Sequence, residues 1–306
     1  MGTTIVRTDD LLTEFSDDKV VVREIEISDL GLFYSWGNFQ FLERSTFLVN
    51  SLGGKNEESG LYQCDLSEKK CLKFQTDMPA IRRHWFSLYD NKKENLFISH
   101  VSNDALYQLD RKGEILVEVG GFRQPGPLQL IDDELLLMET NRAMLLSVDI
   151  NNNLSTKDFQ KFKQGRTQRY PLGYVATEPK GSWWVNILGD RWQHGLIYRY
   201  NDEGELIGAL SMPEGAEPFL LKKLGSDILV SDYVNKRLYI YDQSGELLGE
   251  LYSPAMDKVL VAAREHSAFM MNVVYFCIGI AIVLFILGII VGIKRGDLTA
   301  MKKKQE

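Results

Sequence analysis

Short apolar stretches recur along most of the chain, and each is followed by a second short run that closes on Asp or Asn. The first kind occurs five times, as FLVNS, LFISH, LLMET, WWVNI and ILVSD, starting at Phe47, Leu96, Leu136, Trp183 and Ile228. The second kind closes at Asp65, Asp110, Asp149, Asn201 and Asp242. Short apolar runs bounded by turn residues are typical of β-strands. The pattern therefore predicts a repeated unit of strands.

The spacing of the closing residues identifies the unit. They lie 45, 39, 52 and 41 residues apart, and a mean near 44 matches one four-stranded propeller blade. Three copies continue with RKGE, DEGE or QSGE, where Gly allows the positive φ of a short hairpin loop and the closing acidic residue can cap the turn. We expect an all-β protein, a β-propeller of about six four-stranded blades, over residues 1–253.

The first blade is incomplete in this pattern. Val20 to Ser28, VVVREIEIS, and the preceding TIVRTDD supply the outer two strands of a sixth blade, and the first two strands have no visible source. Either the segment after Leu251 closes the ring, or Met1 lies inside a longer product, and we favour the second. Residues 1–16 also lack the basic and apolar regions of a signal peptide.

The residue pattern of the repeat resembles that of the NHL family of propellers. The resemblance is carried by Asp232, Asn235, Arg237 and Gly245 in VSDYVNKRLYIYDQSGELLGEL and covers about 47–251. The copies that start at Phe47 and Trp183 lack the Asn and Arg, and the chain is similar also to TolB-like and lactonase-type six-bladed propellers. These resemblances imply a fold, and function has to be argued from sites.

The C-terminal part changes character at Pro254. Residues 254–267 predict a helical juxtamembrane connector, 268–293 a transmembrane helix, and 294–306 a short basic tail. Asn272 is the one strongly polar residue in the apolar run, and its 26 residues extend about 39 Å as a helix, more than the roughly 30 Å hydrocarbon core. A buried helix of a soluble core is the alternative, but uninterrupted apolarity on all faces over this length favours the membrane span.

Corresponding positions of the blades should meet around one mouth of the central channel. The strand ends give Asn50, His100, Glu139, Asn186 and Asp232 as candidate ligand-binding residues, with Ser99 and Ser231 beside them. Carboxylate and amide oxygens suit Ca²⁺, and the lactonase-type resemblance implies such a metal site. The alternative is that polar strand ends satisfy exposed backbone groups. We predict no other cofactor.

Other side chains with candidate chemistry are scattered. His84, His100, His194 and His266 occur in no recognised catalytic motif, so we assign no catalytic residue. The cluster of Trp183, Trp184 and Trp192 with His194 suggests either blade packing or a platform for a partner or a sugar.

The net charge restricts the kinds of partner expected for this chain, and two of the cysteines are candidates for a disulfide. The chain carries a net charge of −7, and five basic and two acidic residues follow His266, which leaves −10 before them. An acidic domain repels phosphate backbones, so we expect no nucleic-acid partner. Cys64 and Cys71 flank a candidate hairpin turn, where they form either a disulfide or two free thiols.

The apolar helix predicts attachment to the bilayer and a partner within it. Gly288 and Gly292 form a GxxxG step that could pack against another membrane protein or a second copy. The basic tail favours a cytosolic C-terminus with the propeller outside, whereas the missing signal peptide favours a tail-anchored protein with a cytosolic propeller. We lean to the extracytoplasmic propeller.

Two functions compete. The leading hypothesis is a membrane-anchored propeller that acts as a protein or small-ligand interaction module beside a membrane partner. The alternative is a metal-dependent hydrolase of the lactonase type that uses Glu139, Asn186 and Asp232 at the channel mouth.

Overall fold

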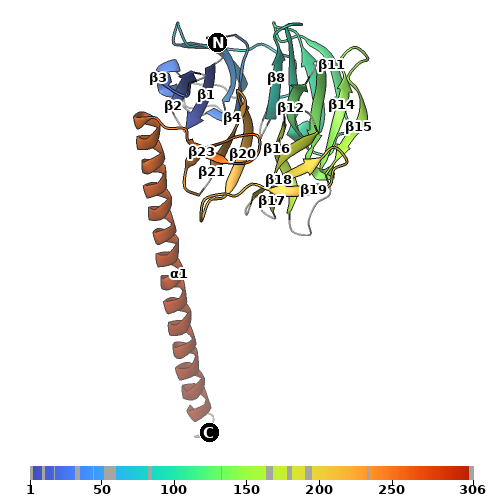
Figure 1. Ribbon diagram of the computed structural model, residues 1–306. Coiled ribbons are helices and arrows are strands. Elements are labelled where there is room, and N and C mark those ends of the chain that lie inside the picture. The colour runs from blue at the N-terminus through green and yellow to red at the C-terminus, as the bar shows by residue number, and fades with distance from the viewer. Residues whose placement is uncertain are drawn as a thin grey trace. The chain divides into compact units, whose positions relative to one another are not determined.

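The protein folds as two compact units, residues 1–257 and 258–306 (Figure 1). The computed structural model describes the backbone of residues 3–302 except 9–10, 17, 32–34, 44, 52–59, 82–84, 132, 163–167, 178–180, 190–194 and 233. The first unit is a β-propeller, and the second is helical throughout its described part.

Five four-stranded antiparallel sheets form blades 1 to 5 of the propeller. Their inner strands contact one another in chain order and are β4 (Ser35–Phe41), β8 (Trp85–Asp90), β12 (Pro125–Ile131), β16 (Gln168–Ala176) and β20 (Pro218–Leu224). The second strands are β5 (Thr46–Ser51), β9 (Asn95–His100), β13 (Glu134–Glu139), β17 (Ser182–Gly189) and β21 (Asp227–Asp232). Four of the five apolar stretches found in the sequence fall in these second strands, and the fifth, LLMET, extends one residue beyond β13 to Thr140.

The third and outer strands complete each blade. The third strands are β6 (Gly60–Asp65), β10 (Ala105–Leu109), β14 (Met144–Asp149), β18 (Leu196–Asn201) and β22 (Arg237–Tyr241). The outer strands are β7 (Lys70–Lys73), β11 (Ile115–Gly120), β15 (Ser155–Lys161), β19 (Leu206–Ala209) and β23 (Leu247–Glu250). Short 3₁₀ helices η2 (Val101–Asn103) and η3 (Thr140–Arg142) link second to third strands.

The prediction of about six four-stranded blades is wrong, because the described residues form five. The remaining sheet has three strands, β1 (Thr3–Thr8), β2 (Leu11–Ser16) and β3 (Val21–Glu26), followed by η1 (Ile27–Leu30). We call it the N-terminal sheet. The two stretches that the sequence suggested for it are β1 and β3, and β2 lies between them. The segment after Leu251 adds no strand before α1 begins.

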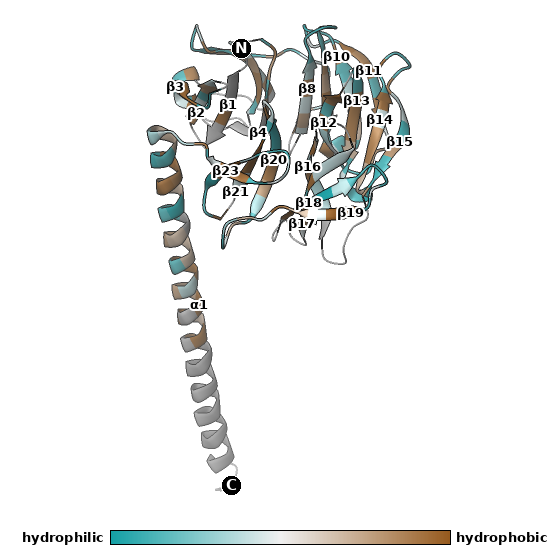
Figure 2. Cartoon of the chain, viewed as in Figure 1, coloured by the Kyte–Doolittle hydropathy of each residue, from teal (hydrophilic) through white to brown (hydrophobic). Residues whose placement is uncertain are grey.

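The core is divided among the spaces between sheets. Apolar residues of each second strand alternate between the preceding and the following blade, because successive side chains of a strand point to opposite faces. In this way clusters join blade 1 to 2, 2 to 3, 3 to 4 and 4 to 5, and a fifth cluster joins the N-terminal sheet to blade 1. Figure 2 shows brown, apolar residues in these strands and teal, polar residues in many loops.

The turn chemistry expected between third and outer strands is confirmed. Asp242 accepts hydrogen bonds at Oδ1 from the backbone N–H of Gly245 and Glu246, both at 2.8 Å. Gly245 has φ of +97° and packs against the Trp184 ring of the preceding blade. The glycine therefore serves both the turn and the contact between blades.

The helix α1 (Pro254–Lys302) follows the propeller. Ser253 caps its first turn, since the Ser253 Oγ accepts from the Met256 N–H at 2.9 Å and donates to Glu24 Oε1 of β3 at 2.5 Å. Within the described residues, Pro254–Ile282 is long and apolar enough to cross a membrane.

Candidate functional site

The candidate strand-end side chains are all buried. The exposed fraction is 0% for Asn50, His100 and Asn186 and 3% for Glu139 and Asp232. His100, Glu139 and Asp232 are the last residues of their second strands, and Asn50 is the next to last. Asn186 lies three residues before the end of β17. Such burial places them among loops and neighbouring blades, so each needs hydrogen-bonding partners there.

Two of these side chains bridge consecutive blades. Asn50 Nδ2 donates to the carbonyl of Ile81 at 3.3 Å, and Asn186 Nδ2 donates to the carbonyl of Phe219 at 2.5 Å. Each accepting carbonyl belongs to the chain entering the next blade. The Oδ1 atoms of both asparagines have no partner among the described residues. Both side-chain amides therefore connect neighbouring blades, and the Oδ1 atom of each accepts no hydrogen bond from the described residues.

The other three hold the chain that enters their own blade. Each lies at the last residue of its second strand and binds a backbone group 15 to 21 residues earlier. The contacts are His100 Nε2 to the Pro79 carbonyl (3.2 Å), the Arg123 N–H to Glu139 Oε1 (2.6 Å), and the Glu217 N–H to Asp232 Oδ1 (3.0 Å). One position of the repeat thus has the same structural use in three blades.

The two carboxylates of the set have further partners. Glu139 Oε2 accepts from Arg142 Nη1 at 2.9 Å, and this contact raises the pKa of Arg142. Asp232 also accepts from the N–H groups of Val234 and Asn235 and from Asn235 Nδ2. Among the described residues no group of three or more His, Cys, Asp or Glu side chains is arranged to hold a metal ion. Both carboxylates therefore already accept hydrogen bonds from the propeller's own groups.

His100 is held as a neutral imidazole. Desolvation by burial lowers its pKa below the ordinary 6.5, although its bond to a backbone carbonyl opposes the shift. Its Nδ1 has no partner among the described residues, and its ring lies 6.2 Å from that of Tyr107. A neutral, fully covered imidazole packed this way is a structural side chain that responds to pH.

The cysteines on blade 1 form a disulfide. Cys64 and Cys71 lie opposite each other in the register of β6 and β7, and their sulfur atoms are bonded. The bond ties the short outer strand to the third strand. Cys277 in α1 is a free thiol.

Two of the clustered tryptophans take part in blade packing. Trp183 belongs to the core cluster between blades 3 and 4, and Trp184 Nε1 donates to the carbonyl of Gln243 in blade 5 at 3.0 Å. Trp192 and His194 lie outside the described residues. The described tryptophans therefore serve the fold, and a partner or sugar platform stays a prediction.

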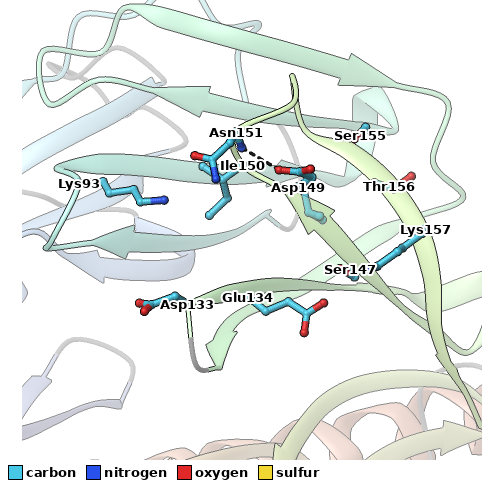
Figure 3. Close-up of a pocket in the computed structure, with 11 residues that line it drawn as sticks. Lys93, Asp133, Glu134, Ser147, Asp149, Ile150, Asn151, Ser155, Thr156 and Lys157 are labelled. Carbon is cyan, nitrogen blue, oxygen red and sulfur yellow. Dashed lines mark hydrogen bonds between the residues drawn. The ribbon is translucent and has the colours of Figure 1, made fainter.

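A shallow depression of about 330 Å³ lies at turns of blades 2 and 3 (Figure 3). Its lining includes Lys93, Asp133, Glu134, Asp149 and Lys157. Figure 3 shows Asp133 and Glu134 at one turn and Asp149 at another, so that the three carboxylates do not converge on one point. The mixture of both charges on an open surface carries no specific chemistry.

One feature escaped prediction, an incompletely covered face on blade 5. Leu229 occupies the third position of its second strand and is half-buried, whereas its counterparts in the other blades are covered. Their exposed fractions are 0, 0, 1 and 2% for Leu48, Phe97, Leu136 and Trp184. No sequence signal marks this difference, because Leu229 has the same apolar context as the others.

Comparison with solved structures supports the propeller fold alone. The chain is similar to a structure in a nidogen/laminin complex, with 11% identity, a TM-score of 0.59, and 83% of this chain and 94% of that one covered. It is similar to the Cps50 (Swd1) β-propeller domain of Myceliophteria thermophila, with 14% identity, a TM-score of 0.52, and coverage of 76% and 77%. It is also similar to virginiamycin B lyase from Staphylococcus aureus, with 11% identity, a TM-score of 0.50, and coverage of 79% and 81%. No protein-family model and no curated protein sequence matches.

Proposed function

We propose that this chain is a single-pass membrane protein whose β-propeller binds another polypeptide beside the membrane. The observation that carries the proposal is the use of the strand-end side chains. Glu139 and Asp232 bind the propeller's own backbone, which favours a recognition scaffold over a reactive centre. The apolar helix that follows would hold this scaffold at the bilayer.

The competing hypothesis is a metal-dependent hydrolase. It would need Glu139, Asn186 and Asp232 to turn their oxygens toward one cation. The described contacts oppose this, because each carboxylate already accepts at least two hydrogen bonds, and Asn186 donates to a carbonyl of the next blade. One similar structure is a lyase, but a shared fold at this identity carries no activity.

We further propose that the propeller lies outside the cytosol. The basic tail, including Lys294 and Arg295, favours a cytosolic C-terminus under the positive-inside rule. The Cys64–Cys71 disulfide supports the same side, since disulfides persist in oxidising compartments and are rare in the cytosol. The sequence and the structure thus provide two independent supports for this orientation.

Within the membrane, the helix is proposed to pack against a partner helix or a second copy at Gly288 and Gly292. Small residues four apart let two backbones approach closely and gain dispersion contacts. We expect this contact to position the propeller, while the propeller itself supplies the recognition surface.

The proposal is tested by extracting the full-length protein from its native membrane in mild detergent and measuring the mass of its complex and its metal content. We expect a defined complex larger than the monomer, weakened by Gly288→Ile with Gly292→Ile. The matched control is Gly279→Ile, which lies nine residues before Gly288 and therefore on the opposite face of the same helix. A monomer that retains one Ca²⁺ or Zn²⁺ per chain would contradict the proposal and support the hydrolase.

A further inference from the structure

The six sheets of the first unit have five well-packed interfaces. Among the described residues a hydrophobic cluster joins each neighbouring pair, except blade 5 and the N-terminal sheet. These two do contact each other, since Lys19 of the N-terminal sheet forms an ion pair with Asp227 of blade 5 at 2.6 Å. The N-terminal sheet therefore lies between blade 5 and blade 1, with one interface poorly filled.

The N-terminal sheet corresponds to the second, third and outer strands of a blade. Its β2–β3 turn places Lys19 at a φ of +64°, as the turn between the third and outer strands of blade 1 places Lys69 at +50°. The burial of β3 alternates as it does in the outer strand β11. Lys19 in this turn pairs with Asp227 of the preceding blade. Arg111, in the corresponding turn of blade 2, likewise pairs with Glu43 of blade 1. The strand without a counterpart is thus the inner one.

Along its inner edge, β1 pairs with no strand of the described residues. In every complete blade, this position is filled by an inner strand that pairs with the second strand. An unpaired strand edge offers a row of N–H and C=O groups to any extended segment that reaches it.

The neighbouring face of blade 5 is open at the same place. Val230 and Leu221 pack toward blade 4, so Leu229 and its strand partner Lys222 point the other way. Asp227 shares this side and reaches Lys19, which shows that the side faces the N-terminal sheet. We call the set Leu220, Lys222, Leu229 and Ser231 the open face.

The exposed fractions of residues on the facing sides of the two sheets show where an inner strand is missing. Phe15 and Ile240 on the third strands are covered, with exposed fractions of 0% and 4%, so the two sheets meet further out. Nearer the axis, Leu220, Leu229 and Ser231 are half-buried and Lys222 is exposed. The gap therefore has the place and the orientation of one inner strand.

The charge of the gap restricts its occupant. Lys222 stands where the other inner strands have Gln40, Leu88, Gln129 and Val175, all uncharged. No ion pair of Lys222 is present among the described residues. The residue is exposed, yet the surrounding protein desolvates its ammonium group enough to lower its pKa. A carboxylate beside Lys222 would restore the stabilisation that the ammonium lacks.

We infer that the open face and the inner edge of β1 form a groove that receives an extended strand of a partner polypeptide, with apolar side chains against Leu229 and an acidic side chain at Lys222. This deepens the proposed function by naming its recognition site. Strand addition uses the free backbone groups for affinity and the side-chain contacts for specificity. The occupant would complete the sixth blade.

The test uses the full-length protein in its native membrane with the photoreactive residue p-benzoylphenylalanine at position 229. The matched control carries the same residue at Leu116, which is exposed on an outer strand. We expect position 229 alone to crosslink to a second polypeptide, and mass spectrometry to map the site to an apolar segment containing Asp or Glu. Adding Lys222→Glu should reduce the crosslink at least tenfold.

A synthetic peptide of the mapped segment provides the second arm. Lys222→Glu should weaken its binding to the purified protein at least tenfold, and exchanging the acidic residue of the peptide for Lys should restore it. An unchanged urea unfolding midpoint of Lys222→Glu shows that the fold is intact. Equal binding of both peptides to both proteins would overturn the charge assignment.

The remaining outcomes separate the groove from the broader function. A complex in mild detergent without a crosslink at position 229 would overturn the groove and leave the interaction module standing. The absence of any complex would instead contradict the module itself. Crosslinking to lipid or to a second copy of the chain would show that the occupant is not the partner strand inferred here.

Discussion

The contact between the glycine turns and the preceding blade leads to a quantitative prediction at Gly204. This residue has φ of +71°, and a Cβ added to it would lie 2.0 Å from the carbonyl oxygen of Lys161 in blade 3. Gly215 has nearly the same φ, +73°, and an added Cβ there meets nothing within 4 Å. The pair therefore separates the cost of conformation from the cost of the contact between blades.

Alanine should destabilise the protein at both positions, and more at Gly204. A left-handed conformation costs a residue with a Cβ about 1–2 kcal/mol. At Gly204 the turn must also move away from blade 3, and forced overpacking adds about 1–3 kcal/mol. We expect a loss of about 2–5 kcal/mol for Gly204→Ala and about 1–2 kcal/mol for Gly215→Ala.

Urea unfolding of the detergent-solubilised protein, followed by tryptophan fluorescence, measures the difference. The free energies of unfolding of both variants and the wild type are compared at an unchanged dependence on urea, so that the change is one of stability. Equal losses for the two alanine variants would refute a tight contact between the turn and the preceding blade.

Three further predictions concern the strand ends and the outer hairpin. Because the folded state lowers the pKa of His100, the stabilising effect of this side chain should be complete above about pH 6.5 and decline as the pH falls below this value. The free energy of unfolding, measured as a function of pH, should therefore fall less in acid for His100→Gln than for the wild type. An equal fall would assign the loss of stability to other groups. Asp232→Asn should lower the free energy of unfolding by about 1–3 kcal/mol, because fewer oxygens accept the N–H groups now bound there, and a change under 0.5 kcal/mol by urea unfolding would contradict that use. Cys64→Ser with Cys71→Ser should cost about 2–3 kcal/mol by removing the constraint on a short loop, and reduction of the wild type should reproduce that loss in the same assay.

The sequence predicted the blades well because their signals are local. The strand from Phe47, its copies, and the turn at Asp242 depend on residues close together in the chain, and all appear where expected. The strand β2 was not predicted, because LLTEFS lacks the alternation of apolar and polar residues that marks an outer strand. The missing inner strand is the reason the count of four-stranded blades fell short.

The candidate site was predicted in position but not in use. His100, Glu139 and Asp232 are strand ends as predicted, whereas β17 continues three residues beyond Asn186. The partners of Asn50 and Glu139 are backbone groups of Ile81 and Arg123, which no residue pattern reveals. Lys222 was overlooked for a related reason. A lysine near the end of a strand is ordinarily solvated, and only the arrangement of neighbouring sheets shows that this one faces a gap.

The central claim is a propeller held outside the cytosol by a membrane-spanning helix. It is tested most directly in intact cells with a thiol probe that cannot cross membranes, using Lys157→Cys in the propeller and Ala300→Cys in the tail, both with Cys277→Ser. The account predicts labelling at position 157 in intact cells, and at position 300 only after permeabilisation. Labelling at position 300 alone in intact cells, or recovery of the protein in the soluble fraction, would contradict it.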